Sequence, residues 1–384
     1  MVRNSPKKAI MPELPRLDKL QIPRTAAFAP RSLREAFADF DDRLRAGLFV
    51  SQTPIRLGFP ELDAALGGGP RPEDFVLIGG RPNAGKTTLA LQAGLQAVEL
   101  QPDLLTIYVC YEHGLSTLLY RLLCMASRGE DDGVTDGTAD VGATLTRAEV
   151  EAVLISQELR TDRQRKRLDL ERLFQRLPAA ECAWWRLQPC LDRLWLITAD
   201  SLHTTLDHLG QYISVARHYS FGRILLVVDY AQRVPLSPAL TRHGFSTEQQ
   251  IDLVVRGLKA LAMSHEIVVL AVAAADETGL RQGRVHLENL WGPATVQYEP
   301  DTALIINKDD LEERAGARRI RIAIEKSRHG QSDIEFFHDL YGAQFWITPQ
   351  GRLVPPDGSY QLERLVDPSP MRRCHGEREA AQGM

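Results

Sequence analysis

The feature that most constrains the fold of this 384-residue chain is an eight-residue segment, GRPNAGKT, at residues 80–87. The segment matches the phosphate-binding pattern G-x-x-x-x-G-K-[ST]. It follows the apolar run FVLIGG and leads into TTLALQAGLQAV, which reads as a buried strand followed by a helix. Glycines let backbone N–H groups curve around phosphate oxygens, and the N-terminus of the helix adds positive potential. The sequence therefore predicts a nucleotide-binding loop between a strand and a helix.

The ligands expected at this loop are ATP and Mg²⁺. Lys86 is expected to reach the β- and γ-phosphates, and the Thr87 hydroxyl is expected to bind the metal. The residues expected to contact the nucleotide are Gly80, Arg81, Pro82, Asn83, Ala84, Gly85, Lys86, Thr87 and Thr88.

Two carboxylates follow other apolar runs. Asp229 ends the run ILLVVD, and Glu112 follows LLTIYVCY. Beside a nucleotide-binding loop, Asp229 is expected to hold Mg²⁺ through water. Glu112 is expected to orient or deprotonate the attacking water. Taken alone each pattern is weak, because apolar runs that end in Asp and surface glutamates at strand ends are both common.

From about residue 55 the chain alternates apolar runs with helical stretches, which is typical of a mostly parallel sheet covered on both faces. The runs expected to be strands are Asp74–Gly79, Leu105–Tyr111, Leu194–Ala199, Ile224–Asp229, Ile267–Ala273 and Thr302–Asn307. The stretches expected to be helices are Thr87–Leu100, Thr117–Ala126, 147–177, Thr205–Ala216 and Glu248–Ala262, with an acidic loop at Gly129–Gly142. The segments RIRIAIEKSRHG and IEFFHDLYGAQFWIT are expected to end the domain as an antiparallel hairpin.

The sequence divides into four expected parts: a flexible basic arm at 1–31, a linker or docking helix at 32–50, an ATPase domain at 51–350 and a polar tail at 351–384. Ser32 and Glu35 form a capping-box signature at the start of the second part. The apolar residues that follow at helical spacing are Leu33, Phe37, Phe40, Leu44 and Leu48. They indicate either an ordinary core helix or a helix that docks on a neighbouring subunit.

Composition narrows the class of protein. No apolar run approaches the length of a membrane helix, and the N-terminal residues lack the apolar core of a secretory signal. Five cysteines form no CxxC pair, which argues against a disulfide framework and favours a reducing, cytoplasmic location. The net charge of −4 does not exclude a nucleic-acid partner, because the first 34 residues hold eight basic and only two acidic side chains.

Five segments in order resemble the RecA-like ATPase domain of DnaB-type replicative helicases. They are RLGFPELDAALGGGPRPEDFVLIGGRPNAGKTTLALQ, YEHGLSTLLYRLLCMAS, ILLVVDYAQRV, LWGPATVQYEPDTALII and RIAIEKSRHGQSD. The resemblance covers about residues 50–350 and implies a RecA-like P-loop NTPase fold. It also places the family's catalytic glutamate on Glu112, its metal-linked aspartate on Asp229 and a nearby glutamine on Gln232.

The same resemblance implies an assembly. In the family the last motif supplies a lysine and an arginine finger to the nucleotide of the next subunit, which places these roles on Lys326 and Arg328. These roles imply that the subunits form a ring, which is expected to be a hexamer. ATP would lie at each subunit boundary, and the helix at 32–48 would dock between neighbours. The alternative for Lys326 and Arg328 is an exposed hairpin with ordinary surface charges.

The chain departs from the family pattern at three places. Fewer residues precede the ATPase domain than in the family, which puts a primase partner in doubt. Ala274 and Glu277 stand where the family has a sensor glutamine and an arginine. Trp291 stands at another arginine position and would either stack on a base or pack internally. Basic residues expected in the DNA-facing loops are Arg233, Arg242, His243, Arg281, Arg284 and His286.

Three functions fit these observations. The first is an ATP-driven ring helicase or translocase on single-stranded DNA, with a role in plasmid, phage or other mobile-element replication. The second is an ATP-dependent oligomeric switch that loads other proteins on DNA, which Ala274 favours. The third is a recombinase filament. The presence of Glu112, Asp229 and Arg328 favours the first.

Overall fold

A computed structural model describes residues 32–47, 52–128, 144–158, 178–314 and 316–354. The chain divides into two compact units, Met1–Gln52 and Thr53–Met384. The expected basic arm, the acidic loop, most of the polar tail and the end of the helix predicted at 147–177 lie outside the described residues. None of the helices within the described ranges combines the length and the apolar composition needed to cross a bilayer.

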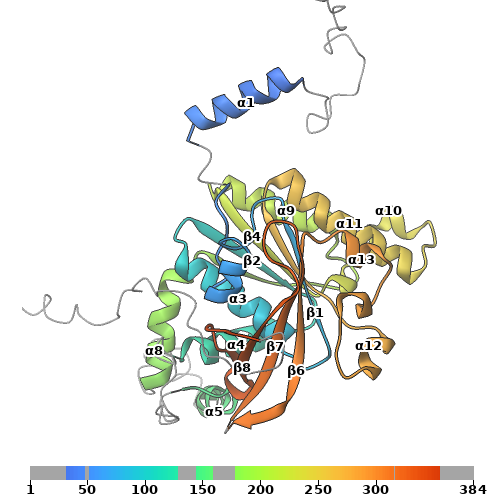
Figure 1. Cartoon of the computed structure of the whole chain (residues 1–384). Helices are drawn as coiled ribbons and strands as arrows, with labels where there is room; N and C mark the ends of the chain where they lie inside the picture. The colour runs from blue at the N-terminus through green and yellow to red at the C-terminus, as the bar shows by residue number, and fades with distance from the viewer. Residues whose placement is uncertain (1–31, 48–51, 129–143, 159–177, 315, 355–384) are drawn as a thin grey trace, which may run out of the picture. The chain divides into compact units, whose positions relative to one another are not determined.

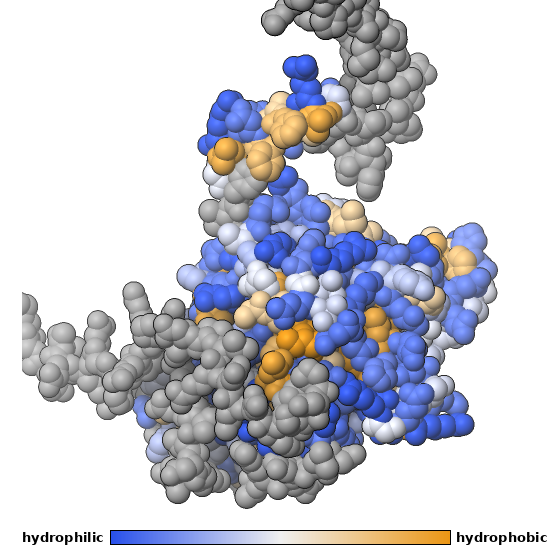
Figure 2. All heavy atoms as spheres, viewed as in Figure 1, coloured by the Kyte–Doolittle hydropathy of each residue, from blue (hydrophilic) through white to orange (hydrophobic). Residues whose placement is uncertain are grey.

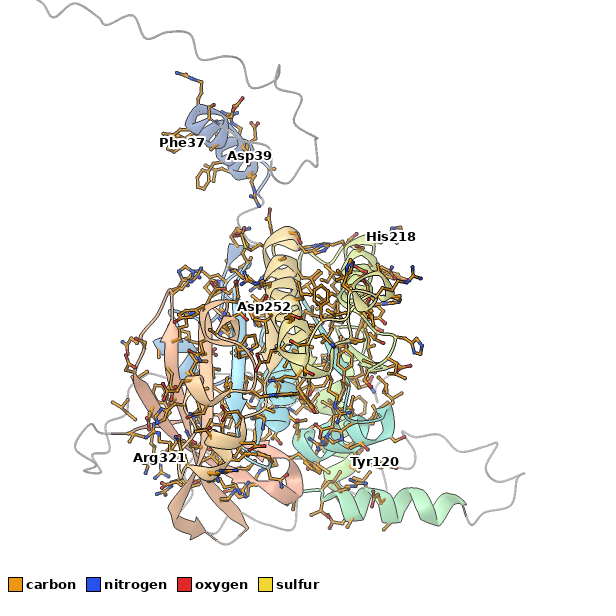
Figure 3. All side chains as sticks on the ribbon, turned by 90° about the vertical axis from the view of Figure 1, so that its right-hand side faces the viewer. Phe37, Asp39, Tyr120, His218, Asp252 and Arg321 are labelled. Atoms are coloured by element: carbon orange, nitrogen blue, oxygen red, sulfur yellow. The ribbon has the colours of Figure 1, made fainter. Side chains whose placement is uncertain are left out.

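The first unit contributes one described helix, α1 (Leu33–Arg45). The predicted capping box forms, because the Ser32 side chain accepts from the backbone N–H of Glu35, and the Glu35 carboxylate accepts from that of Ser32. No residue of α1 is buried, and Leu33, Phe37 and Leu44 are 73%, 65% and 59% exposed. Figure 2 shows this apolar surface in orange, and Figure 3 shows Phe37 projecting from the helix.

The second unit is built on a ten-stranded sheet in the order β10-β8-β7-β6-β1-β5-β4-β2-β3, with β9 paired to β8. Its strands are β1 (Phe75–Gly80), β2 (Leu104–Cys110), β3 (Leu194–Thr198), β4 (Arg223–Asp229), β5 (Val268–Val272), β6 (Thr302–Arg314), β7 (Ala317–Ser327), β8 (Ile334–Tyr341), β9 (Trp346–Ile347) and β10 (Arg352–Leu353). From β6 to β3 all pairs are parallel, whereas β7, β8 and β10 add antiparallel pairs. The predicted fold class is confirmed.

Helices cover both faces of the sheet (Figure 1). They are α2 (Pro60–Ala65), α3 (Lys86–Leu100), α4 (Leu115–Ala126), α5 (Arg147–Glu158), α8 (Pro178–Leu187), α9 (Leu206–His218), α10 (Pro238–Thr241), α11 (Thr247–His265), α12 (Glu277–Arg281) and α13 (Thr295–Tyr298), with short 3₁₀ turns η4 (Gln188–Cys190), η5 (Ala231–Arg233), η6 (Leu287–Asn289) and η7 (Gly342–Gln344).

The central strands β1, β2, β4 and β5 are buried because successive side chains enter two different cores. Val76 and Ile78 of β1 lie in the core that includes residues of α3, α4 and α8. Phe75 and Leu77 lie in the core that includes residues of α9 and α11. This alternation explains why the parallel strands appear in the sequence as continuous apolar runs.

The C-terminal strands differ most from the sequence expectation. β6 does not stop near Asn307 but continues to Arg314, paired with β7. The second half of β6 is charged, so it does not appear in the sequence as an apolar run. Within it, the buried side chain of Asp309 forms an ion pair with Arg321 of β7 at 3.1 Å. Arg352 and Leu353, placed in the polar tail by the sequence, form β10 on β8.

Candidate active site

The phosphate loop runs from the end of β1 into α3, as predicted. Gly80 has a φ of +149°, and a Cβ there would lie 2.5 Å from the carbonyl oxygen of Ile306. Gly85 caps α3 with a φ of +106°. Both conformations favour glycine, so the two glycines of the pattern are required by the backbone of this chain. The turn leaves the first N–H groups of α3 free for an anion.

Lys86, the first residue of α3, turns back onto the loop. Its Nζ donates to the carbonyl oxygens of Gly80 at 2.9 Å and Arg81 at 2.8 Å. Burial lowers the pKa of Lys86 to about 8, and the negative charges of Asp229 and Glu112 act in the opposite direction. The ammonium group therefore lies inside the loop, with two acids close enough to influence it.

The side chains of Thr87, on α3, and Asp229, at the end of β4, lie close together at the edge of the sheet formed by the carboxyl ends of its parallel strands. The Thr87 hydroxyl lies 3.4 Å from Oδ1 of Asp229, the last residue of β4. The other carboxylate oxygen, Oδ2, accepts from the Tyr108 hydroxyl at 2.9 Å. Burial raises the pKa of Asp229, and the hydrogen bonds from Tyr108 and Thr87 partly offset this. A hydroxyl and a fixed carboxylate form the donor set that Mg²⁺ uses beside nucleotide phosphates, so the residues fit the expected metal.

Glu112 lies at the same edge of the sheet. β2 ends at Cys110, which is in register with Asp229 of β4, and Glu112 follows two residues later. Its side chain is exposed, so the carboxylate faces solvent at the carboxyl ends of the strands. His113 follows, and its ring lies 3.0 Å from the guanidinium of Arg121. The site therefore has a solvated acid available to activate water.

The remaining residues of the phosphate loop differ in their contacts and in their exposure to solvent. Arg81 donates to the carbonyl oxygen of Leu280 at the edge of α12. Pro82 and Asn83 are exposed, whereas Ala84 and Thr88 are buried. The buried pair therefore packs beneath the loop, and the exposed pair forms its outer rim.

Lys326 and Arg328 lie at the opposite edge of the sheet, which here means the end where the parallel strands β1 and β6 begin. Ser327 of β7 pairs with Thr302 of β6, which in turn pairs with Val76 near the start of β1. The phosphate loop instead leaves the end of β1, about 16 Å further along at the ordinary rise of a strand. Arg328 therefore lies beyond reach of the phosphate loop of its own chain.

The basic residues expected to face DNA follow β4 and β5, two neighbouring strands. Arg233, Arg242 and Arg281 are exposed. Arg233 donates to the Tyr230 hydroxyl at 2.9 Å and lies over the Tyr230 ring. Two of the four pair with an acid: Arg284 with Glu335 of β8, and Arg281 with Glu277 of its own helix at 3.4 Å. The Arg281 pair is fully at the surface, so Arg284 is the one candidate whose charge is partly withdrawn from solvent.

The segment that carries Ala274 is joined to the end of β4 by Gln232. The Gln232 amide donates to the carbonyl oxygen of Trp291 at 3.1 Å and accepts from the backbone N–H of Ala274 at 3.4 Å. Trp291 also donates its backbone N–H to Ala274 at 2.9 Å, and its side chain is 41% exposed. Gln232 therefore connects the two expected DNA-facing loops close to Asp229.

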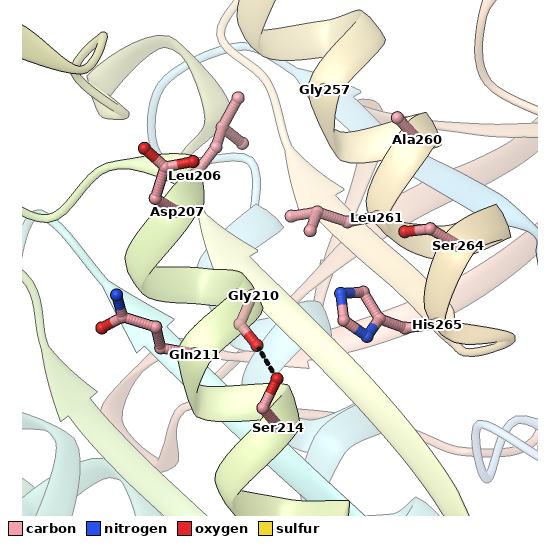
Figure 4. Close-up of a pocket in the computed structure, with 10 residues that line it drawn as sticks. All are labelled: Leu206, Asp207, Gly210, Gln211, Ser214, Gly257, Ala260, Leu261, Ser264 and His265. Carbon is pink, nitrogen blue, oxygen red and sulfur yellow. Dashed lines mark hydrogen bonds between the residues drawn. The ribbon is translucent and has the colours of Figure 1, made fainter. Parts of the chain in front are cut away.

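A solvent-open groove of about 400 Å³ lies between α9 and α11. Figure 4 shows the residues that line it, among them Ser214, whose hydroxyl donates to the Gly210 carbonyl oxygen at 2.9 Å. None of its lining residues belongs to the phosphate loop or to the strand ends beside it. The groove is thus separate from the candidate active site. Within the described ranges, no three His, Cys, Asp or Glu side chains gather as a metal site.

Sequence reasoning missed two residues of the site. Tyr108 fixes Asp229, and Arg318 of β7 donates to the carbonyl oxygen of Asn83 in the loop at 2.7 Å. A tyrosine inside an apolar strand needs a hydrogen-bond partner, which is a signal for Tyr108. Arg318 is brought to the loop by the antiparallel return of β7, which no local pattern encodes.

Comparisons with known proteins agree with this fold. Residues 54–177 match the DnaB-like helicase C terminal domain. The chain is 44% identical over 64 residues to the DNA repair protein RadA of Escherichia coli (strain K12), covering 17% of this chain and 13% of that protein. It is 36% identical over 90 residues to the Replicative DNA helicase DnaB of Leifsonia xyli subsp. xyli, covering 23% of this chain and 19% of that protein. The chain thus spans less than a fifth of either relative.

Two solved structures share the fold over most of the chain. One, solved as an isolated ATPase domain, superposes with a TM-score of 0.61 at 17% identity, covering 83% of this chain and 98% of that chain. A DnaB-like replicative helicase, solved in a study of its interactions with primase, superposes with a TM-score of 0.60 at 17% identity, covering 82% and 67%. The chain therefore has the fold of RecA-like helicase ATPase domains, and it resembles the C-terminal domain of DnaB-type replicative helicases.

Proposed function

We propose that this protein is an ATP-hydrolysing, ring-forming helicase or translocase that acts on single-stranded DNA. The observation that carries the proposal is the meeting of Lys86, Thr87, Asp229 and Glu112 at one edge of a parallel sheet. This edge brings together a loop that can bind phosphates, a carboxylate that can bind Mg²⁺ and a second carboxylate that can accept a proton from water. The family resemblance supports a helicase function.

Each residue at this edge has one task in hydrolysis. ATP supplies the phosphoryl group, and Mg²⁺ supplies positive charge along the phosphates. Lys86 exchanges its two loop carbonyls for phosphate oxygens. Thr87 and Asp229 would hold the metal. Glu112 accepts a proton from the attacking water.

Arg328 supports the oligomeric part of the proposal. Since it lies at the sheet edge opposite its own phosphate loop, the nucleotide that it can serve belongs to another subunit. An arginine supplied in this way stabilises charge on the transferred phosphoryl group and is worth about 10³–10⁵ in rate. We therefore expect ATP at subunit boundaries and a low turnover for isolated monomers.

The helix α1 supports assembly in a second way. Its exposed stripe of Leu33, Phe37, Phe40 and Leu44 is the kind of surface that a helix buries against a partner. A helix in the first unit that docks on the second unit of the next subunit would link neighbours around a ring. The exposed Arg233, Arg242 and Arg281 would then contact the DNA phosphates.

One observation favours a second function, an ATP-dependent switch that loads other proteins on DNA without unwinding it. Ala274 lacks a side chain that could report the γ-phosphate to the DNA-facing loops, and Gln232 makes only a backbone bond there. Weak coupling between ATP hydrolysis and DNA binding is expected of a switch rather than of a motor.

Strand displacement separates the two functions. The wild-type protein is mixed with ATP, Mg²⁺ and a forked DNA duplex, and release of the labelled strand is followed in time. The motor predicts ATP-dependent release that is absent with Lys86→Ala. ATP hydrolysis without release, under conditions in which the fork is bound, would support the switch instead.

A further inference from the structure

We propose that Asp301 is the residue that positions Arg328 for action on the neighbouring nucleotide. The inference rests on the proposed function, because it concerns the same arginine. Asp301 immediately precedes β6, at the sheet edge opposite the phosphate loop. It is not itself in a place to touch nucleotide, and its role is to fix a side chain that does.

Asp301 is rigidly held. Its side chain is 2% exposed, and Oδ2 accepts from the backbone N–H of Phe75 and from Nζ of Lys259, both at 2.7 Å. Its own backbone N–H donates to the Phe75 carbonyl oxygen at 2.8 Å. These bonds tie the carboxylate to β1 and to α11, so its second oxygen has a fixed position.

That second oxygen binds the arginine. Oδ1 of Asp301 lies 2.9 Å from Nη1 of Arg328, and the backbone N–H of Arg328 donates to the Asp301 carbonyl oxygen at 3.0 Å. Among the described residues, Asp301 is the one acid within ion-pair distance of this guanidinium. Arg328 is therefore held at both its backbone and its side chain by one residue.

The guanidinium is nevertheless available to a partner. Its side chain is 54% exposed, whereas that of Lys259 is 14% exposed. Since Lys259 already offsets the charge of the carboxylate, the positive charge of Arg328 is not cancelled. A guanidinium has five N–H donors in a fixed fork, so one can bind Asp301 while others face a phosphate. Asp301 thus orients the fork without neutralising it.

Lys326 provides a contrast within the same motif. Its Nζ donates to the backbone carbonyl oxygens of Gln297 at 2.9 Å and Tyr298 at 2.7 Å. No carboxylate forms an ion pair with it in the described residues, although the charges of Asp301 and Glu299 reach it, and it lies on β7, two positions before Arg328. The two basic residues are therefore held by different groups, and Asp301 binds Arg328 directly.

A subunit-mixing experiment tests this role. Arg328→Ala chains keep a complete phosphate loop but donate no arginine, and Lys86→Ala chains lack an active loop but donate Arg328. Mixed in equal amounts, they are expected to recover ATP turnover that neither has alone. The Lys86→Ala chain is then replaced by Lys86→Ala/Asp301→Asn. We expect the recovered turnover to fall at least about tenfold, because a small misplacement of a catalytic group has effects of that size.

Asp74→Asn is the matched control. Asp74 is a second buried carboxylate at the same edge of the sheet, where it accepts from Arg71 N–H at 2.7 Å and faces His329 at 3.4 Å. It makes no bond to Arg328 in the described residues. The charges of Asp74 and Asp301 repel each other, but Asp74→Asn leaves both bonds between Asp301 and Arg328 in place. A Lys86→Ala/Asp74→Asn donor is therefore expected to restore turnover within about twofold of the Lys86→Ala donor.

The outcomes are distinguishable. If Lys86→Ala fails to complement Arg328→Ala at all, the trans arginine itself is wrong. If complementation occurs and the Asp301→Asn donor matches the Asp74→Asn donor, Asp301 has no positioning role. Thermal unfolding and native mass spectrometry of the mixtures verify that each donor folds and assembles. Should Asp301→Asn fail to fold, Asp301→Glu keeps the charge and displaces the guanidinium by one methylene. Full complementation by that donor would overturn the proposal, and a loss would support it.

Discussion

At the scale of single residues, the proposed function requires the side chains of the site to exchange the partners that they have in this structure for ATP and Mg²⁺. Lys86 binds two loop carbonyls, and Asp229 is held by Tyr108 and Thr87. The pattern around residues 80–87 allowed Lys86 and Thr87 to be predicted, since the chemistry is local to the loop. A tyrosine in an apolar strand signals that Tyr108 needs a hydrogen-bond partner, but not that the partner is Asp229, and nothing in the sequence signals the role of Asp301, because both roles come from contacts made across strands.

The lowered pKa of Lys86 predicts how nucleotide affinity depends on pH. Below about pH 8 the free protein already carries the ammonium charge that the phosphates need. Above that pH most Lys86 side chains are neutral, so binding must take up a proton. Affinity should therefore fall by up to about tenfold per pH unit above the pKa and stay flat below it.

A fluorescent ATP analogue titrated at several pH values measures this dependence. Lys86→Arg is the control, because an arginine keeps its charge throughout the range. The control should bind more weakly but without the decline at high pH. An equal decline in both proteins would assign the effect to another group.

Removal of the Tyr108 hydroxyl should weaken metal use. Tyr108→Phe deletes a bond to a buried carboxylate, worth roughly 1.5–3 kcal/mol. The pKa of Asp229, already raised by burial, should rise further. In Tyr108→Phe, the loss of ATP turnover on acidification should therefore occur at a higher pH than in the wild-type protein. Half-maximal turnover of this variant should also need severalfold more Mg²⁺.

Tyr111→Phe is the matched control, because the Tyr111 hydroxyl donates instead to the Thr204 carbonyl oxygen at 2.8 Å. Steady-state ATP turnover against Mg²⁺ concentration and pH measures both variants. Identical responses would show that the Tyr108 hydroxyl does not act through Asp229.

At the scale of elements, the sequence predicted the parallel strands and their helices well, because burial on both faces makes each strand a continuous apolar run. The antiparallel end was less predictable. The extension of β6 beyond Asn307 is charged, so it is not an apolar run, and it forms because β7 follows at once and pairs with it, with Arg314 opposite Ala317. The helix α1 was predicted from its capping box and apolar stripe; it ends at Arg45, and Leu48 of the predicted stripe lies outside the described residues.

The stripe on α1 predicts a specific assembly defect. Replacing both Phe37 and Leu44 by Ser removes two apolar side chains that a partner would bury, worth about 1.5–3 kcal/mol each. The association constant should fall at least about a hundredfold, which sedimentation velocity would measure. ATP turnover should fall with it, whereas binding of the nucleotide analogue should persist.

Asp41→Asn is the control for α1, since it breaks only an exposed ion pair with Arg45 on the same helix. Assembly should be within about twofold of wild type in that variant. If the double Ser variant assembles as well as Asp41→Asn, α1 is not the docking element.

At the scale of the whole molecule, the candidate residues lie at two opposite edges of the sheet, the carboxyl ends and the amino ends of its parallel strands. One edge holds the phosphate loop, Asp229 and Glu112, and the other holds Lys326 and Arg328 with Asp301. Under the proposed function, a chain with its hydrolytic residues and its arginine on opposite edges would complete its site by placing one copy next to another. The net charge of −4 is compatible with DNA binding, because exposed arginines follow β4 and β5.

The most direct test of the central claim is steady-state ATP turnover with and without single-stranded DNA. Wild-type protein should show severalfold higher turnover at saturating DNA, and the DNA concentration required should rise steeply with salt, since phosphate contacts release counterions. Glu112→Gln should bind the same DNA and lose turnover by about 10²–10⁴. Turnover unchanged by single-stranded DNA, at concentrations far above any measured binding, would contradict a motor that acts on DNA.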